Sequence, residues 1–308
     1  MKHRSIFLGG ILIMMLVACG SPVATTEPQE PTSIPPEPTS TSAPEPTSTT
    51  SLPSLPGREV IAITEMEQGI PWLPFDENKR PAVFYFALNI HSEPLDDPLV
   101  RQALAAALDR QRFAQMPRNV SIKQPATSLT PATILGRDLY NEVGVGFDPE
   151  HARELLAEAG YPNGEGFPKL TFYVHNIGQA PLENSLSYNV VLRATEMWQE
   201  NLNIQVELQV VETEANYQAY FDSVMAGQPN FFEIYWVADY FDPDNFLTLF
   251  VSDGPYNLLG FASAEFDQLV EQAAGLTDPV ERQALYIEAE RVLTEKEIAV
   301  IPLFYTIK

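Results

Sequence analysis

The strongest constraint on the fold is an alternation of strand and helix patterns between residues 170 and 236. Apolar residues recur at every second position in the strand-like stretches and at helical spacing in the stretches between them. Strands separated by helices need crossover connections, which place the helices against the faces of a sheet. The alternation therefore predicts a crossover-connected α/β fold. The expected elements are strands at 170–174, 204–210 and 231–236, and helices at 186–202 and 213–227.

Similar patterns extend this arrangement in both directions along the chain. Asp97-Pro98, Asp148-Pro149 and Asp278-Pro279 each place a capping side chain before a proline, which is typical of helix starts. Gly160 is suited to end a helix in the left-handed conformation. The expected helices are 97–114, 148–160, 263–275 and 278–296. The expected strands are 60–63, 82–90 and 298–305, the last interrupted by Pro302.

The N-terminus has the composition of a signal peptide rather than of a folded element. Lys2 and Arg4 precede an apolar run at 6–17, which is too short to span a bilayer comfortably. The run ends in Leu-Val-Ala-Cys, and this resembles the lipobox of bacterial lipoproteins, in which cleavage precedes an acylated cysteine. We therefore expect residues 1–18 to be removed and Cys19 to carry a lipid anchor. Cys19 is the only cysteine, so the sequence excludes a disulfide framework.

The residues that follow Cys19 predict a tether. Up to residue 57 the chain consists mainly of Pro, Thr, Ser and Glu with almost no large apolar side chain, so it cannot bury enough surface to offset its ordering entropy. Its prolines favour an extended, semi-stiff spacer. We therefore interpret 19–57 as a lipidated cysteine with a disordered tether, and 58–308 as the folded domain. About 250 residues are ample for a substantial core.

The charge of the chain argues against nucleic acid as a partner. The net charge is −23, and cleavage before Cys19 would remove Lys2, Arg4 and no acid, which brings it to −25. A surface this acidic repels phosphate backbones. Solubility is the simpler explanation of the charge, because net charge reports on solubility and nonspecific binding rather than on fold.

Catalytic and metal-binding patterns are not found. The sequence contains no G-x-S-x-G, H-E-x-x-H or Walker A motif. His91, His151 and His175 are far apart in sequence, and lipidation would remove Cys19 as a nucleophile. We therefore predict a protein that is not an enzyme and that has no metal and no cofactor.

The segment YWVADYFDPDNF at 235–246 stands out as a candidate ligand site. It leaves a predicted strand, and open α/β sheets bind ligands at the carboxyl ends of their strands. Aromatic side chains beside carboxylates suit an amphiphilic ligand with a positive group, because a buried carboxylate needs a partner. The structural alternative stays open: Asp242-Pro243 is also a good helix start, and Trp236 is also a typical core residue.

Stretches along the whole domain resemble the family 5 extracellular solute-binding proteins, the oligopeptide, dipeptide and nickel receptors of ABC importers. The stretches are FALNIHSEPLDDPLVRQALAAALDRQ (86–111), FDPEHARELLAEAGYPNGEGFPKLTFYV (147–174), YWVADYFDPDNFLTLF (235–250), NLLGFASAEFDQLVEQA (257–273) and DPVERQALYIEAERVLTEKEIAVIPLFY (278–305). The resemblance implies an α/β lobe of the periplasmic-binding-protein type II kind, with a mixed sheet flanked by helices.

The resemblance also assigns roles to individual residues. It implies that Asp239, in the W-x-A-D motif, pairs with the α-amino group of a peptide. Trp236 and Asn257 match positions that line the same cleft, and we expect Tyr240 to add apolar contact. Arg101 and Asp109 match motif residues with a structural role.

Family members are usually much longer, with a first lobe formed by residues on both sides of the matching segment. We therefore expect only the second lobe and its hinge strands, near 82–90 and 298–305. Because the usual partners of these strands would be absent, unpaired strand edges are expected to favour association with a partner chain.

Two functions from different classes follow from these observations. The first is a substrate-binding lipoprotein of an ABC importer, held outside the cytoplasm by its anchor, that binds peptides or similar solutes and contacts the permease subunits. The second is an interaction or structural surface lipoprotein that no longer binds solute alone. A cell-surface hydrolase ranks last, because no nucleophile, metal site or acid pair can be assigned.

Overall fold

The structure is a computed structural model that describes residues 80–116, 123–176, 181–212, 222, 224, 226–227, 229–258 and 260–307. All of them belong to a compact unit formed by Ile63–Lys308. The predicted signal peptide, tether, strand 60–63 and most of helix 213–227 lie outside the described residues. Among the helices that are described, none combines the length and the apolar character needed to cross a membrane.

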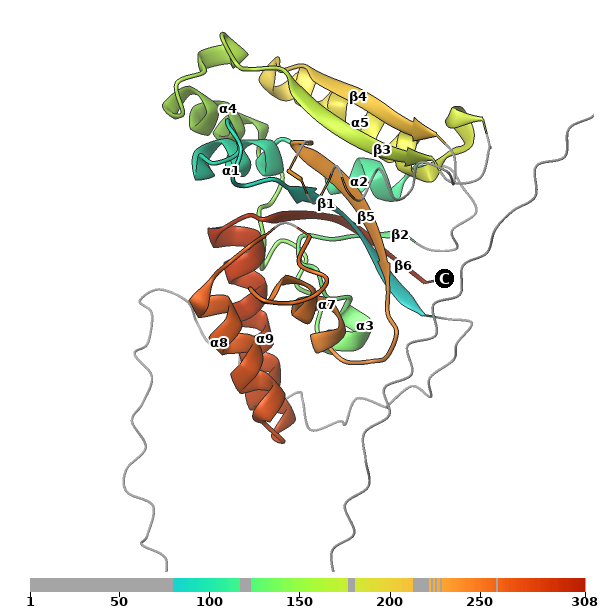
Figure 1. Cartoon of the computed structure of the whole chain (residues 1–308), viewed down its shortest axis with the longest axis vertical. Helices are drawn as coiled ribbons and strands as arrows, with labels where there is room; N and C mark the ends of the chain where they lie inside the picture. The colour runs from blue at the N-terminus through green and yellow to red at the C-terminus, as the bar shows by residue number, and fades with distance from the viewer. Residues whose placement is uncertain are drawn as a thin grey trace, which may run out of the picture. The chain divides into compact units, whose positions relative to one another are not determined.

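The centre of the described fold is a mixed six-stranded sheet with the order β2-β6-β1-β5-β3-β4 (Figure 1). β3 is parallel to β4 and β5, as the crossover pattern predicts, whereas β1 is antiparallel to β5 and β6. The strands are β1 (Pro81–Leu88), β2 (Lys123–Pro125), β3 (Leu170–Asn176), β4 (Val206–Glu212), β5 (Phe231–Val237) and β6 (Val300–Ile307).

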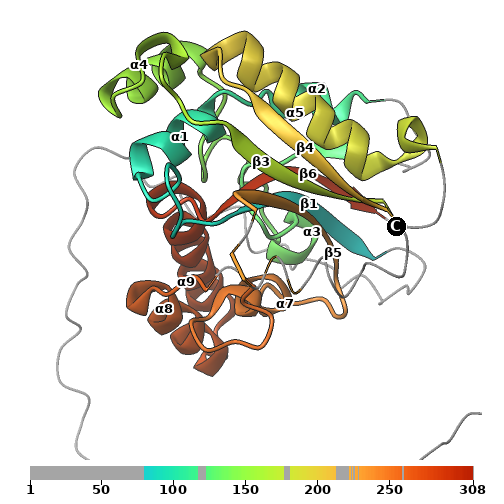
Figure 2. The same ribbon diagram turned by 45° about the horizontal axis from the view of Figure 1, so that its top comes forward.

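Helices cover both faces of the sheet (Figure 2). One face packs against α1, α4 and α5, and the opposite face packs against α7, α8 and α9. The helices are α1 (Pro98–Ala106), α2 (Arg110–Ala114), α3 (Ala132–Leu135), α4 (Pro149–Glu158), α5 (Leu186–Leu202), α7 (Asp244–Leu247), α8 (Ala264–Gly275) and α9 (Pro279–Arg291), which continues as a π-helical turn at Val292–Lys296.

β1 is the structural centre because both of its faces are buried. All eight of its residues are buried, as expected for a strand with helices on both sides. Phe84 and Phe86 point into the core shared with α1, α4 and α5, whereas Val83 and Tyr85 point into the core shared with α8 and α9. The continuous apolar run in the sequence therefore reflects a strand between two cores.

The predicted helix starts are confirmed. The side chains of Asp97, Asp148 and Asp278 accept hydrogen bonds from backbone N–H groups in the first turns of α1, α4 and α9. Gly160 follows α4 with a φ of +96°, as expected for a left-handed stop. The predicted helix 97–114 is instead two helices, because Asp109 leaves the helical conformation and caps α2.

The expectation of unpaired hinge strands is wrong. β1 lies between β5 and β6, and β6 lies between β1 and the short β2, so both strands are internal to the sheet. Pro302 does not interrupt β6 either. A register shift at Phe84/Tyr85 accommodates the proline, which has no N–H to donate.

Arg101 and Asp109 have the structural roles that the resemblance implies. Arg101 is buried, and its guanidinium donates to the carbonyl oxygens of Leu95, Asp96 and Glu297. Burial lowers the pKa of Arg101, and these carbonyls satisfy its donors.

Candidate functional site

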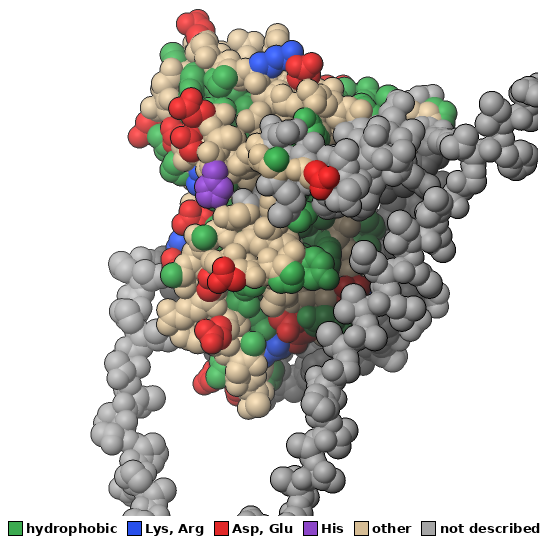
Figure 3. Space-filling view, viewed as in Figure 1, with side chains coloured by type: hydrophobic (Ala, Val, Ile, Leu, Met, Phe, Trp, Pro, Cys, Tyr) green, Lys and Arg blue, Asp and Glu red, His purple; other side chains and the backbone are tan. Residues whose placement is uncertain are grey.

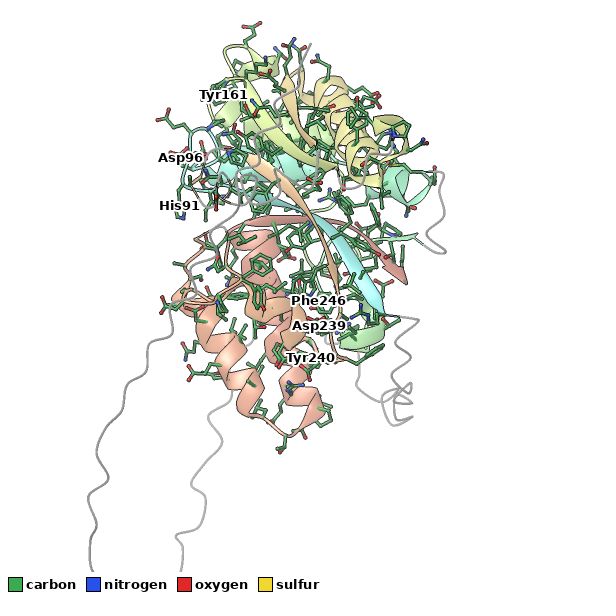
Figure 4. The ribbon with its side chains drawn as sticks, turned by 45° about the vertical axis from the view of Figure 1, so that its right-hand side comes forward. His91, Asp96, Tyr161, Asp239, Tyr240 and Phe246 are labelled. Carbon is green, nitrogen blue, oxygen red and sulfur yellow. The ribbon has the colours of Figure 1, made fainter. Side chains whose placement is uncertain are left out.

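The candidate site lies where β5 ends and the chain turns into α7. Asp239 and Tyr240 follow the strand directly, and Phe246 anchors α7 in the core. Figure 4 shows these three side chains close together, whereas His91 and Asp96 lie at the opposite end of the sheet. The sequence therefore placed the candidate segment correctly at the carboxyl end of a strand, beside the start of β1.

Asp239 is the carboxylate of this segment that projects outward. Its side chain is 64% exposed, and its Oδ1 lies 3.6 Å from Nη1 of Arg80. Its backbone N–H donates to Oδ1 of Asn245 at 3.1 Å. The backbone is thus held in place while the carboxylate faces solvent, which is the arrangement required to accept a cationic group from outside.

Trp236 lies beside Asp239 as a partly exposed aromatic surface. Its indole N–H donates to Oδ1 of Asn245 at 3.1 Å. Its ring is 6.0 Å from the ring of Tyr256, with an interplanar angle of 59°, and Tyr256 is 63% exposed. The two rings offer apolar surface next to the exposed carboxylate, so Trp236 is more than a core residue.

Asn245 is a site residue that the sequence analysis missed. It is only 4% exposed, and one oxygen accepts hydrogen bonds from both Trp236 and Asp239. A single buried amide therefore positions the indole and the backbone of the carboxylate. Its place on the first turn of α7 was visible in the sequence, but its acceptor role depends on how the loop folds back onto β5.

The carboxylate of Asp242 is already bound by another side chain of the protein. Arg282, on α9, donates to both of its carboxylate oxygens at 2.5 and 2.9 Å. The same guanidinium donates to Ala273 O and to the hydroxyl of Tyr286, and it lies 4.9 Å from the centre of the Tyr286 ring. Burial raises the pKa of Tyr286 to about 12. This network ties the loop after β5 to α9, so Asp242 serves the structure.

Asp244 and Tyr240 form the third part of the segment. Partial burial raises the pKa of Asp244, and the neighbouring Asp242 carboxylate raises it further. Burial and a hydrogen bond to Asp244 also raise the pKa of Tyr240, whose side chain is 47% exposed. Tyr240 is therefore half exposed to solvent while its hydroxyl is held by the loop.

Asn257 organises its own loop. Its Nδ2 donates to the carbonyl oxygens of Val251, Ser252 and Phe261, and its Oδ1 accepts from the N–H of Phe261. These bonds hold the loop that carries Tyr256 beside Trp236. Contact between Asn257 and a ligand remains a prediction.

Carboxylates are common on the surface of the domain (Figure 3), but among the described residues they form no evident metal site. Figure 3 shows many carboxylates and few basic side chains on the face seen in Figure 1. Nowhere in the described part of the chain do three His, Cys, Asp or Glu side chains gather closely enough to hold a metal ion.

A groove of about 570 Å³ lies elsewhere, between α5 and β4. It contains none of the candidate ligand residues, and its carboxylates are paired with Arg193, Arg112 and Lys169. We therefore assign the site from the chemistry at the end of β5 rather than from this groove.

The mixed sheet with helices on both faces is shared with solved structures of periplasmic binding proteins. Residues 51–257 match the profile of the bacterial extracellular solute-binding proteins, family 5 Middle. The chain belongs to this family of binding proteins.

Individual relatives agree with the family assignment. The periplasmic oligopeptide-binding protein OppA of Salmonella typhimurium is 30% identical over 231 residues, which cover 72% of this chain and 39% of that protein. The heme-binding protein A of Haemophilus influenzae is 31% identical over 239 residues, covering 75% and 40%. The solved structure of the Escherichia coli murein tripeptide binding protein MppA has a TM-score of 0.62 at 26% identity, covering 75% and 44%. The chain thus spans less than half the length of these relatives.

Proposed function

We propose that this protein is a substrate-binding component of an ABC importer and that it binds peptides or similar solutes through a positively charged amino group. The observation that carries the proposal is the exposed Asp239 carboxylate at the end of β5. A ligand ammonium would form a charge-assisted hydrogen bond there. Trp236 and Tyr240 would supply apolar contact beside it, and Asn257 would support the loop that completes the surface.

The ligand class follows from the charge and the aromatic rings together. A carboxylate selects a cation, and the neighbouring indole and phenol rings favour a ligand with apolar groups next to that cation. A peptide N-terminus has both features. The relatives include an oligopeptide-binding protein and a heme-binding protein, so the family alone does not name the solute.

The proposal includes the location of the protein. Residues 1–18 would be a cleaved signal peptide, Cys19 would carry the lipid anchor, and 19–57 would hold the domain 58–308 away from the membrane. The protein would act outside the cytoplasm and deliver its solute to the permease subunits.

A second candidate function is a surface lipoprotein that interacts with other proteins and does not bind solute alone. The openness of the site favours it, since Asp239 is 64% exposed and Tyr256 is 63% exposed. Ligand sites usually enclose most of their ligand. Catalysis is not part of either proposal, because the family consists of binding proteins.

The test is the substitution Asp239→Asn, which nearly preserves shape and removes the charge. Loss of one charge-assisted hydrogen bond costs about 1.5–3 kcal/mol, so affinity for trialanine should fall about 10- to 150-fold. N-acetylated trialanine should bind the parent protein poorly and should be almost indifferent to the substitution. Calorimetric titration measures both.

Asp96→Asn is the matched control, because Asp96 is exposed and lies at the opposite end of the sheet (Figure 4). It removes the same charge and should leave the affinity unchanged. If Asp239→Asn lowers the melting temperature but leaves peptide affinity at the parent value, Asp239 is a structural residue. Failure of the parent protein to bind any peptide would favour the interaction lipoprotein.

A further inference from the structure

The register of the sheet places a cation opposite the candidate ligand carboxylate. β1 and β5 are antiparallel, with Ala82 paired with Val237, and the N–H of Ala238 donates to Pro81 O at 2.9 Å. One step further along both strands brings Arg80 opposite Asp239. Directly opposed residues in an antiparallel pair lie within side-chain contact, so the pairing of β1 with β5 creates this ion pair.

The contact between the two side chains is loose. Nη1 of Arg80 lies 3.6 Å from Oδ1 of Asp239 and donates to Ala238 O at 3.4 Å. Charge-assisted hydrogen bonds usually have lengths of about 2.7–2.9 Å. The side chain of Arg80 is 32% exposed, and exposed ion pairs are weak because water screens them. The Arg80 side chain can therefore move aside when a ligand ammonium approaches Asp239, while the next residue, Pro81, stays paired with Ala238.

The other arginine of the site is not available in this way. Arg282 donates to both oxygens of Asp242 and to the Tyr286 hydroxyl, so its position is set by several bonds. Among the described contacts of Arg80, those to Asp239 and Ala238 both use Nη1. A guanidinium has five N–H donors, and the others can serve an anionic group on a ligand.

We infer that Arg80 is a specificity-determining residue of this site, which favours ligands that carry a carboxylate close to their ammonium group and disfavours ligands that carry a second cation there. The inference rests on the proposed function. A ligand ammonium bound to Asp239 would have the Arg80 guanidinium as its immediate neighbour. The guanidinium would therefore attract a negative charge, or repel a positive charge, on the next group of the ligand. Two unit charges about 7 Å apart and well exposed to water change affinity about threefold, and salt weakens the effect.

The experiment compares the tripeptides Ala-Glu-Ala and Ala-Lys-Ala on the full chain. Their affinities are measured by calorimetric titration at low salt for the parent protein and for Arg80→Gln. The substitution should shift the ratio of the two affinities toward the lysine peptide by about three- to tenfold. Arg80→Lys should keep most of the parent ratio, because it keeps the charge and loses only the planar fork.

Arg112→Gln is the matched control. Arg112 is 34% exposed and forms an exposed ion pair with Glu200, so it resembles Arg80 in exposure and in the charge it removes. It should leave the affinity ratio at the parent value, which separates a local effect from a change in net charge. A ratio that stays within about twofold of the parent in Arg80→Gln overturns the inference.

The outcomes separate this inference from the proposed function. If Asp239→Asn weakens tripeptide binding but Arg80→Gln leaves the affinity ratio unchanged, the ammonium site stands and the role of Arg80 does not. If neither tripeptide binds the parent protein or any variant, both are overturned.

Discussion

Asn245 offers the most direct test of how the candidate site is built. Its Oδ1 is the shared acceptor for the indole N–H of Trp236 and the backbone N–H of Asp239, each at 3.1 Å. Asn245→Ala removes both hydrogen bonds at a position that is 4% exposed. Each neutral hydrogen bond contributes about 0.5–1.5 kcal/mol, so the free energy of unfolding should fall by about 1–3 kcal/mol. The melting temperature should fall by about 2–4 °C for each kcal/mol.

The functional consequence is a looser site. Without the Asn245 acceptor, the Trp236 ring and the Asp239 backbone are no longer held in one arrangement, so a ligand must order them on binding. The affinity for trialanine should fall, but by less than in Asp239→Asn, because the carboxylate itself remains. Faster hydrogen exchange of the Trp236 indole N–H, measured by NMR, should report the lost bond directly.

Asn230→Ala is the matched control for this substitution. The amide of Asn230 accepts the N–H of Thr171 at 2.9 Å, just before β5 begins. Its loss should cost similar stability without changing the exchange of the Trp236 indole or the peptide affinity. The reasoning is refuted if Asn230→Ala weakens peptide binding as much as Asn245→Ala, because the loss would then reflect general destabilisation.

Three further outcomes are expected. Glu290 is fully buried, and its carboxylate accepts hydrogen bonds from the N–H groups of Leu129 and Thr130 at 2.7 Å. Glu290→Ala should therefore lower the free energy of unfolding, measured in urea, by about 2–5 kcal/mol. A loss below about 1 kcal/mol would contradict this. The pKa of Asp244 is raised, so the folded protein holds this proton more tightly than the unfolded chain, and stability should fall as the pH rises above the usual carboxyl range. Melting curves from about pH 4 to about pH 7 should show a smaller pH dependence in Asp244→Asn, and an unchanged slope would contradict the assignment. Cys19→Ser should abolish metabolic lipid labelling and membrane attachment, and unchanged labelling would exclude acylation at this residue.

Local patterns in the sequence predicted the elements and the segment that holds the candidate site. Helix starts at Asp97, Asp148 and Asp278 could be identified because a capping bond joins residues two or three positions apart. The strand that ends before Asp239 could be identified from its apolar run, and the class of site from the residues that follow. Such signals depend only on spacing along the chain.

The contacts that distinguish the carboxylates of the site depend on tertiary structure. Asp239 and Asp242 have the same chemistry in sequence, but Asp242 contacts Arg282 from α9, whereas Asp239 contacts the partly exposed Arg80. The sequence also suggested that the hinge strands, β1 and β6, have unpaired edges. Both are internal to the sheet, because β5 pairs with β1 and β2 pairs with β6. Strand register and helix docking join residues far apart in the chain, and side-chain packing across the whole core decides them, so spacing in the sequence does not reveal which charges meet.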